Sequence, residues 1–436
     1  MSRYFSIKTI SKIILFSIAI IILNMILFKT YSAISDMSGI FEGFEEKRQS
    51  IDKDAFDDND FSYDFKESFF ANRGTSYAVL EASTLRVLGG ENIDKKMEMA
   101  STTKIMTALV VLENSNLDKE FKIPKEAVGI EGSSIYLKEN QIWTIRDLLY
   151  GLMLRSGNDS AMALAIATAG SCDRFVEMMN EKAEELNLKN THFENPHGLH
   201  SDTHYTSAYD LAVISSYAMR NDEFVKIVSS KSYVAEANQT KERQYFLNKN
   251  KLLSSYDGAN GIKTGYTTDS GRCLVSSALK NNMQVVCVVL NCYDMWNACS
   301  HYMDKAFDEY QPVEMGKKGD ILATLDINDK EYSLALQSNF VLPLKEGDNI
   351  ECEGFFDIDE SLEVPVEKGS VVGKINFYND NRLLFGVNIV NIEEINDTGV
   401  LRKLKNLTGN WNASFIDGEI KQIFGINGGS IQKRCG

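Results

Sequence analysis

The sequence predicts an α+β fold, an antiparallel sheet with helices, followed by a small all-β sandwich domain. Between residues 77 and 290, strand-like runs stand at both ends and helix-like periodicity stands between them. After about residue 315, short β-type runs alternate with turn-forming Gly, Asn and Asp, which favours a sandwich. With 44% hydrophobic residues, 25% charged residues and 5 prolines, the composition is globular and excludes collagenous or wholly disordered chains.

The elements follow in order along the chain. Two paired strands are expected at 77–80 and 86–88, followed by a helix at 99–112 whose nearly continuous apolar residues indicate burial on most sides. Four more segments carry apolar residues at three- and four-residue spacing and predict helices: 145–153, 160–169, 174–186 and 209–219. Short polar turns then separate three strands of an antiparallel meander: 261–267, 272–279 and 283–290.

The N-terminus predicts export. Basic residues Arg3, Lys8 and Lys12 precede an apolar run of 16 residues at 13–28, so residues 1–35 form either a signal peptide or an N-terminal membrane anchor. The small residues Ala33 and Ser35, with Ile34 between them, suit cleavage, whereas snorkelling of Lys29 would suit an uncleaved anchor. The positive flank stays inside, so we expect the rest of the chain to be extracytoplasmic, at the outer face of the bacterial cell membrane or secreted.

Three further segments complete the domain plan. Residues 36–72 predict an acidic linker, because 41–70 hold ten Asp and Glu against four Lys and Arg. The α+β domain is placed at 73–314 and the β domain at 315–396. Residues 397–436 form a tail in which 400–407 fit either a basic amphipathic helix that contacts the membrane or a plain surface helix.

Charge and cysteine count exclude other classes. A net charge of −15 without a basic patch disfavours nucleic acid as a partner. Seven cysteines without a Cys-x-x-Cys pair suit neither a disulfide framework nor a zinc ribbon. The crowded histidines His197, His200 and His204 lack the His-Glu-x-x-His pattern of a metal peptidase, so we expect a structural loop, with no metal and no cofactor.

The candidate catalytic residues lie at the start of the predicted apolar helix. Ser101 and Lys104 are three residues apart, which places a hydroxyl and an amine on one helix face. Burial and a nearby cation lower the pKa of a lysine, and the neutral amine can then accept the serine proton. Without further evidence, Ser101 could equally be a helix N-cap.

Two other motifs favour the catalytic interpretation. Ser156-Gly157-Asn158 stands at the end of a helical run, where a loop can present a hydroxyl and an amide. Lys263-Thr264-Gly265 opens the meander, and Gly265 leaves its backbone open to a ligand. In this order, Ser-x-x-Lys, Ser-x-Asn and Lys-Thr-Gly are the three-part signature of penicillin-recognising serine enzymes.

The chain resembles the low-molecular-weight penicillin-binding proteins, D-alanyl-D-alanine carboxypeptidases of peptidase family S11. The similarity rests on five segments: 99–108, 131–138, 148–159, 195–199 and 257–265. Segment 362–373 resembles the C-terminal β domain of that family. The resemblance implies a serine β-lactamase/transpeptidase-like catalytic domain at 73–314.

The resemblance also implies residue roles. Ser101 would be the acylated nucleophile, Lys104 its base and Ser156 a proton relay toward the leaving D-alanine. Asn158 would hold the substrate amide. Lys263, Thr264 and Gly265 would form the strand that receives the substrate, with its carboxylate at Lys263 and Thr264 and an oxyanion hole at the N–H groups of Ser101 and Tyr266.

Three departures from the family accompany these roles. Ser160 stands where alanine is frequent, and Tyr266 stands where some members have histidine. An arginine found in some members near the carboxylate site is not evident, with Lys251 as a substitute.

The expected activity is removal of the C-terminal D-alanine from peptidoglycan stem peptides that end in D-Ala-D-Ala, with covalent binding of β-lactams and an association with the cytoplasmic membrane. A β-lactamase or a D,D-endopeptidase would use the same residues, and a catalytically inert wall-binding scaffold is a further alternative.

Overall fold

The computed structural model of the chain describes residues 75–236, 243–327, 330–337, 339–358, 362, 365–379, 382–396, 408–416, 419–426 and 429–431. The predicted export segment and acidic linker lie outside these residues. Within the described part, the helices are too short or too polar to cross a membrane.

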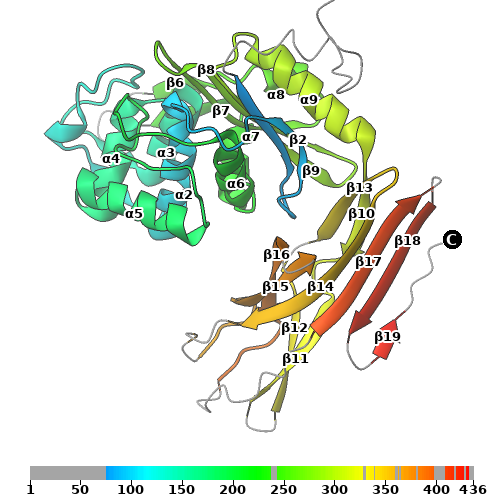
Figure 1. The fold of residues 1–436 in the computed structure, drawn as a ribbon. Helices are drawn as coiled ribbons and strands as arrows, with labels where there is room; N and C mark the ends of the chain where they lie inside the picture. The colour runs from blue at the N-terminus through cyan, green and yellow to red at the C-terminus, as the bar shows by residue number, and fades with distance from the viewer. Residues whose placement is uncertain are drawn as a thin grey trace, which may run out of the picture. The chain divides into compact units, whose positions relative to one another are not determined.

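A five-stranded antiparallel sheet lies at the centre of the first domain (Figure 1). Its spatial order is β2-β1-β9-β8-β7, which leaves β7 at an edge. The strands are β1 (Ser76–Glu81), β2 (Val87–Glu91), β7 (Ala259–Thr267), β8 (Gly271–Lys280) and β9 (Met283–Leu290). The pairing of β7, β8 and β9 confirms the predicted meander, and Asn281 and Asn282 turn between β8 and β9 with positive φ angles.

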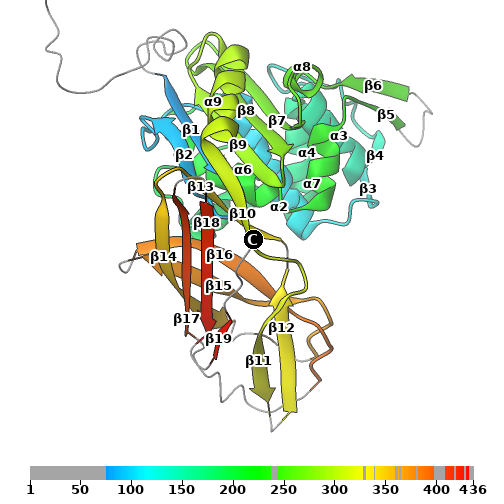
Figure 2. The same cartoon turned by 90° about the vertical axis from the view of Figure 1, so that its right-hand side faces the viewer.

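Helices cover both faces of this sheet (Figures 1 and 2). Six pack on one side: α2 (Lys104–Asn114), α3 (Ile145–Arg155), α4 (Asn158–Ala169), α5 (Cys172–Glu185), α6 (Ala208–Ala218) and α7 (Asp222–Ser229). On the other side lie α8 (Leu252–Ser255) and α9 (Met295–Glu309). Because successive side chains of a strand alternate, Ala78 and Leu80 join the first hydrophobic core and Val79 joins the second.

The helix ends follow from local sequence. Thr144, Ser171 and Ser207 accept hydrogen bonds from backbone N–H groups in the first turns of α3, α5 and α6. The five predicted helices are present, whereas sequence periodicity missed α7 and α9. It also missed two small hairpins: β3 (Glu120–Lys122) with β4 (Ile142–Thr144), and β5 (Ser232–Glu236) with β6 (Arg243–Leu247).

The second domain is built of strands, as predicted. Strand β10 (Tyr310–Gly316) pairs with β13 (Phe340–Lys345). A larger sheet has the order β11-β12-β16-β15-β14-β17-β18-β19. Its first five strands in chain order are β11 (Ile321–Ile327), β12 (Lys330–Leu336), β14 (Asn349–Ile358), β15 (Val371–Asn379) and β16 (Arg382–Asn391). Val313 and Leu342 of the small sheet share a hydrophobic core with Tyr332, Ile375 and Ile389 of the large one, which is the packing of a sandwich.

The structure differs from the prediction after residue 397. The expected tail contains three strands that continue the large sheet from β14: β17 (Thr408–Ile416), β18 (Glu419–Ile426) and β19 (Gly429–Ile431). The intervening dipeptides Asp417-Gly418 and Asn427-Gly428 are strong signals for two-residue hairpins, which agrees with the pairing of β17 with β18 and of β18 with β19. The helix expected at 400–407 lies outside the described residues.

Candidate active site

Ser101 and Lys104 lie on one continuous helical segment. A 3-10 helix (Ala100–Thr103) runs directly into α2, so the two side chains emerge on the same side. The Ser101 Oγ is 3.0 Å from the Lys104 Nζ, and Ser101 is partly exposed while Lys104 is fully buried. The structure therefore brings together the predicted hydroxyl and amine.

The surroundings of the Lys104 amine favour its neutral form. Burial, followed by the positive charges of Lys263 and Lys249, holds the pKa of Lys104 well below the ordinary lysine value. Two carbonyl oxygens accept hydrogen bonds from this amine: the Asn158 Oδ1 at 2.7 Å and the backbone carbonyl of His197. A neutral amine has two N–H donors and one lone pair, so these carbonyls take both donors and leave the lone pair for the hydroxyl of Ser101.

Ser156 and Asn158 stand at the break between α3 and α4. Ser156 ends α3 in the left-handed conformation, with φ 64°, and Asn158 begins α4 two residues later. This sharp turn directs both side chains toward the start of α2. The Asn158 Nδ2 donates to the carbonyl of Glu131 while its Oδ1 receives the Lys104 amine, so the orientation of the amide is fixed.

Lys263, Thr264 and Gly265 lie on the edge strand β7. The Lys263 Nζ donates to the Ser156 Oγ at 3.0 Å and to the Thr264 carbonyl at 2.9 Å, and Lys263 is only 2% exposed. Burial, with a smaller contribution from the charge of Lys249, lowers the pKa of Lys263 to about 7. Lys263 thus connects the meander to Ser156.

Gly265 allows the close approach of β7 to the nucleophile. A Cβ at this position would lie 3.0 Å from the Met99 carbonyl oxygen and 3.2 Å from the Ser101 nitrogen. A Cβ at this position would therefore force β7 or the start of the helix to shift by a few tenths of an ångström, so the glycine favours the close approach of the strand to Ser101. The three sequence motifs therefore converge on one place.

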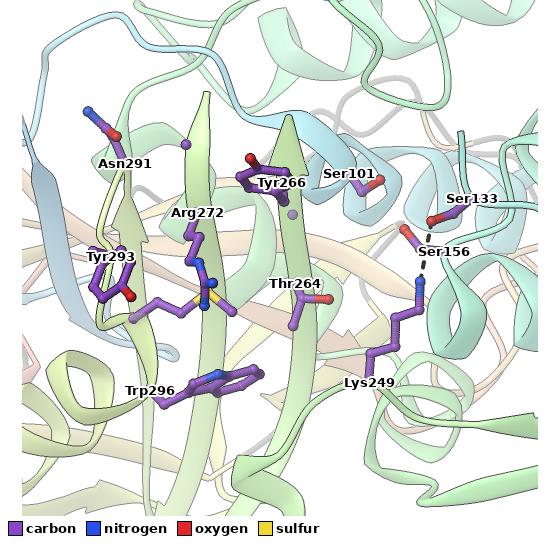
Figure 3. Close-up of a pocket in the computed structure, with 13 residues that line it drawn as sticks. Ser101, Ser133, Ser156, Lys249, Thr264, Tyr266, Arg272, Asn291, Tyr293 and Trp296 are labelled. Atoms are coloured by element: carbon purple, nitrogen blue, oxygen red, sulfur yellow. Dashed lines mark hydrogen bonds between the residues drawn. The ribbon is translucent and has the colours of Figure 1, made fainter. Parts of the chain in front are cut away.

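A cavity of about 640 Å³ opens over these groups (Figure 3). Five of the predicted residues line it: Ser101, Ser156, Thr264, Gly265 and Tyr266. Lys104, Asn158 and Lys263 lie behind this lining. The lining also contains eight residues that were not predicted: Ser133, Lys249, Gly271, Arg272, Asn291, Tyr293, Met295 and Trp296.

Two positively charged residues that were not predicted, Lys249 and Arg272, face the cavity. The Lys249 Nζ donates to the Ser133 Oγ at 3.3 Å, and the Arg272 guanidinium lies 5.2 Å from the centre of the Tyr293 ring (Figure 3). Arg272 could have been found, because it is the cross-strand partner of Tyr266 in the meander. The suggested substitute Lys251 does not line the cavity, and its Nζ lies 5.9 Å from the centre of the Trp296 ring.

The three histidines take separate positions. Burial is the main cause that lowers the pKa of His197 to about 3 and that of His204 to about 4. His200 is exposed and its Nδ1 lies 2.8 Å from a carboxylate oxygen of Glu98. His197 and His204 therefore belong to a buried structural loop against α2, as expected, and the loop contacts Lys104 through the His197 carbonyl.

Comparison with known families identifies both domains. Residues 65–293 match the family described as D-alanyl-D-alanine carboxypeptidase, peptidase S11. Residues 310–397 match the family described as penicillin-binding protein 5, C-terminal domain.

Individual relatives agree with the family matches. The chain is 29% identical over 359 residues to D-alanyl-D-alanine carboxypeptidase DacF of Bacillus subtilis, covering 79% of this chain and 92% of the relative. It is 37% identical over 213 residues to the D-alanyl-D-alanine carboxypeptidase of Streptomyces sp. K15, covering 45% of this chain and 73% of the relative. Penicillin binding protein 5 of Haemophilus influenzae superposes with a TM-score of 0.54 at 26% identity, covering 74% of this chain and 97% of that structure.

Proposed function

Because the chain belongs to the peptidase S11 family of D-alanyl-D-alanine carboxypeptidases, we propose that it removes the terminal D-alanine of peptidoglycan stem peptides through an acyl-enzyme on Ser101. The observation that carries this mechanism is the 3.0 Å distance between the Ser101 Oγ and an amine whose two N–H donors are already taken by carbonyls. An amine so placed is a general base for the hydroxyl.

In the acylation step, the Lys104 amine takes the proton of Ser101 while the Oγ attacks the carbonyl carbon of the penultimate D-alanine. The carbonyl oxygen becomes an oxyanion, which the backbone N–H groups of Ser101 and Tyr266 stabilise. The C–N bond then breaks, and the proton held by Lys104 passes to the leaving D-alanine nitrogen through Ser156, which lies between Lys263 and the cavity, so Lys104 is neutral again. In the second step, Lys104 takes a proton from the water that attacks the ester and gives it to the Ser101 Oγ as the ester bond breaks, which restores the neutral amine and the hydroxyl.

The residues behind the lining and those in it have different roles. Asn158 is buried behind the lining with its amide bonded to Lys104 and to the Glu131 carbonyl, so we assign it the positioning of the Lys104 amine in place of direct contact with the substrate amide. Thr264 and the two cations that face the cavity, Lys249 and Arg272, are the partners for the terminal carboxylate. Lys263 is buried and bonded to Ser156, so we assign it an electrostatic effect on Ser156 in place of direct carboxylate binding.

Covalent penicillin binding is typical of this family, and it follows from the same chemistry. A β-lactam offers a strained amide and a carboxylate in the arrangement of D-Ala-D-Ala, so Ser101 would open the ring and form a penicilloyl ester.

The carboxypeptidase and β-lactamase alternatives differ in deacylation. Release of D-alanine from diacetyl-Lys-D-Ala-D-Ala, together with slow loss of the penicilloyl adduct, would support the carboxypeptidase. Rapid penicillin hydrolysis would support a β-lactamase, and cleavage of cross-linked dimers without D-alanine release would support an endopeptidase. A Ser101→Ala variant should lose about 10³-fold or more of the release rate. A folded wild-type protein that shows none of these three activities would leave the inert scaffold as the answer.

We further propose that the catalytic domain works outside the membrane. The proposal is supported by the basic and apolar pattern of residues 1–28, which favours export, and by the location of peptidoglycan beyond the membrane. A fusion of residues 1–72 to a reporter enzyme that is active only after export tests this. An inactive fusion that accumulates in the cytoplasm would refute it.

A further inference from the structure

The peptide group between Ala100 and Ser101 is held in an unusual backbone conformation. Ala100 has φ 47°, in the left-handed region that residues with a Cβ rarely adopt. Its carbonyl accepts a hydrogen bond from the Thr103 Oγ1 at 2.9 Å. Gly198 packs against the same carbonyl so closely that a Cβ there would overlap its oxygen. The direction of this carbonyl is therefore fixed from two sides.

Thr103 is in turn held by His204. The His204 Nε2 lies 2.8 Å from the Thr103 Oγ1, and both residues are buried. The His204 Nδ1 accepts a hydrogen bond from the backbone N–H of Glu194 at 3.0 Å. The proton of the neutral ring must then be on Nε2, from which it is donated to the Thr103 oxygen, and the Thr103 hydroxyl proton is left for the Ala100 carbonyl.

This chain of hydrogen bonds acts on the Ser101 N–H. A trans peptide group is planar, so the direction of the Ala100 carbonyl sets the opposite direction for the Ser101 N–H. The Ser101 nitrogen faces Gly265 on β7, at 3.2 Å from where a Cβ would stand. We propose that Thr103 and His204 are positioning residues that aim the Ser101 N–H at the oxyanion, an inference that rests on the acyl-enzyme function proposed above.

The chain offers a matched control. Thr102 is also buried on the 3-10 helix, but its Oγ1 donates to the Met99 carbonyl at 2.6 Å and so acts on a different peptide group. If the threonines of this helix had only a structural role, Thr102→Val and Thr103→Val would have similar effects on acylation. If Thr103 positions the Ser101 N–H, only Thr103→Val should slow acylation. Thr103→Ser, which keeps the hydroxyl, should then acylate like the wild type.

The experiment measures acylation by a fluorescent penicillin in stopped flow, which separates the initial binding constant from the acylation rate constant. Thr103→Val should lower the rate constant about 10- to 100-fold with little change in initial binding, since loss of an oxyanion donor typically lowers rates 10²–10³-fold and misalignment is a milder change. His204→Phe should act in the same direction, whereas Thr102→Val and Thr103→Ser should remain within about threefold of wild type.

Infrared spectroscopy of the acyl-enzyme supplies a second readout. With a ¹³C-labelled penicillin carbonyl, the ester stretch should move to higher frequency in Thr103→Val and His204→Phe, because the carbonyl loses a hydrogen bond, and should not move in Thr102→Val.

The results also separate this inference from the function on which it rests. Wild-type acylation rates and an unshifted ester band in Thr103→Val would overturn the inference, and if that variant does not fold, the same results in His204→Phe would overturn it. A wild-type protein that forms no adduct would overturn the function itself.

Discussion

The hydroxyl of Ser160 allows a quantitative test of the packing behind the active site. Ser160 lies in the first turn of α4, is fully buried, and within the described residues its Oγ has no hydrogen-bond partner. Cβ atoms on Gly151 and Gly157 would stand 2.9 and 2.8 Å from this oxygen, so it is tightly enclosed. We predict that Ser160→Ala stabilises the protein.

The magnitude follows from three contributions. Removal of an unsatisfied buried hydroxyl gains about 1 kcal/mol at the lower end of its range. The higher helix propensity of alanine adds about 0.3 kcal/mol. The small space left by one oxygen atom subtracts about 0.4 kcal/mol. The net gain of about 1 kcal/mol corresponds to about 2–4 °C in Tm for a domain of this size.

The assay is thermal and urea unfolding of the wild type and two variants. Ser215→Ala is the matched control, because Ser215 is also buried on a helix but donates its hydroxyl to the Leu211 carbonyl at 2.6 Å. Ser160→Ala should gain stability with D-alanine release unchanged, while Ser215→Ala should gain none. A loss of stability in Ser160→Ala, or equal gains in both variants, would refute the reasoning.

Three further predictions concern the loop that Asp159 holds and two cations of the cavity lining. Asp159→Ala should destabilise the protein by about 3 kcal/mol in urea unfolding, because the buried carboxylate accepts hydrogen bonds from Ser134 Oγ and the backbone N–H groups of Ile135 and Leu137. In Lys249→Met, the pH at which the acylation rate falls off on the acid side should be higher than in the wild type. Removal of the positive charge raises the depressed pKa of Lys104, so less of its amine is neutral at a given pH. Arg272→Gln should raise KM for diacetyl-Lys-D-Ala-D-Ala about tenfold in the D-alanine release assay and should have little effect on a C-terminal amide of the same peptide.

Each of these predictions has an opposing result. An Asp159→Ala protein as stable as wild type would mean that the loop before Lys138 does not depend on this carboxylate. An acid limb that moves to lower pH in Lys249→Met would show that Lys249 does not depress the base. An equal KM change for the acid and the amide peptides would remove Arg272 from carboxylate binding.

The sequence was sufficient for the parts of the fold that depend on local patterns. The meander was predictable because the strands alternate between two cores and end at turn residues such as Asn281 and Asn282. Helix α9 was missed, although its buried face completes the second core. The strands of the tail were not predicted, because the apolar residues at 400–407 have helical spacing, whereas the hairpin signals are two dipeptides farther along the chain.

The candidate active site was likewise predictable where it depends on local sequence motifs. Three motifs with fixed spacing identified Ser101 and its partners, and the structure places them together. Lys249 could not be found by motif, because its proximity to Ser101 depends on the fold of distant segments. Arg272 belongs to no motif either, and only the register of β8 against β7 in the predicted meander could have indicated it. Burial of Lys263 likewise depends on tertiary packing, and it changes the expected role of that residue.

The central claim is that the Ser101 hydroxyl, activated by a neutral Lys104 amine, forms the acyl-enzyme. The most direct measurement is peptide mapping by mass spectrometry after brief exposure to penicillin. The account predicts one penicilloyl group, on the peptide that contains Ser101, and none in a folded Ser101→Ala variant. An adduct on another residue, or D-alanine release that persists in Ser101→Ala, would contradict it.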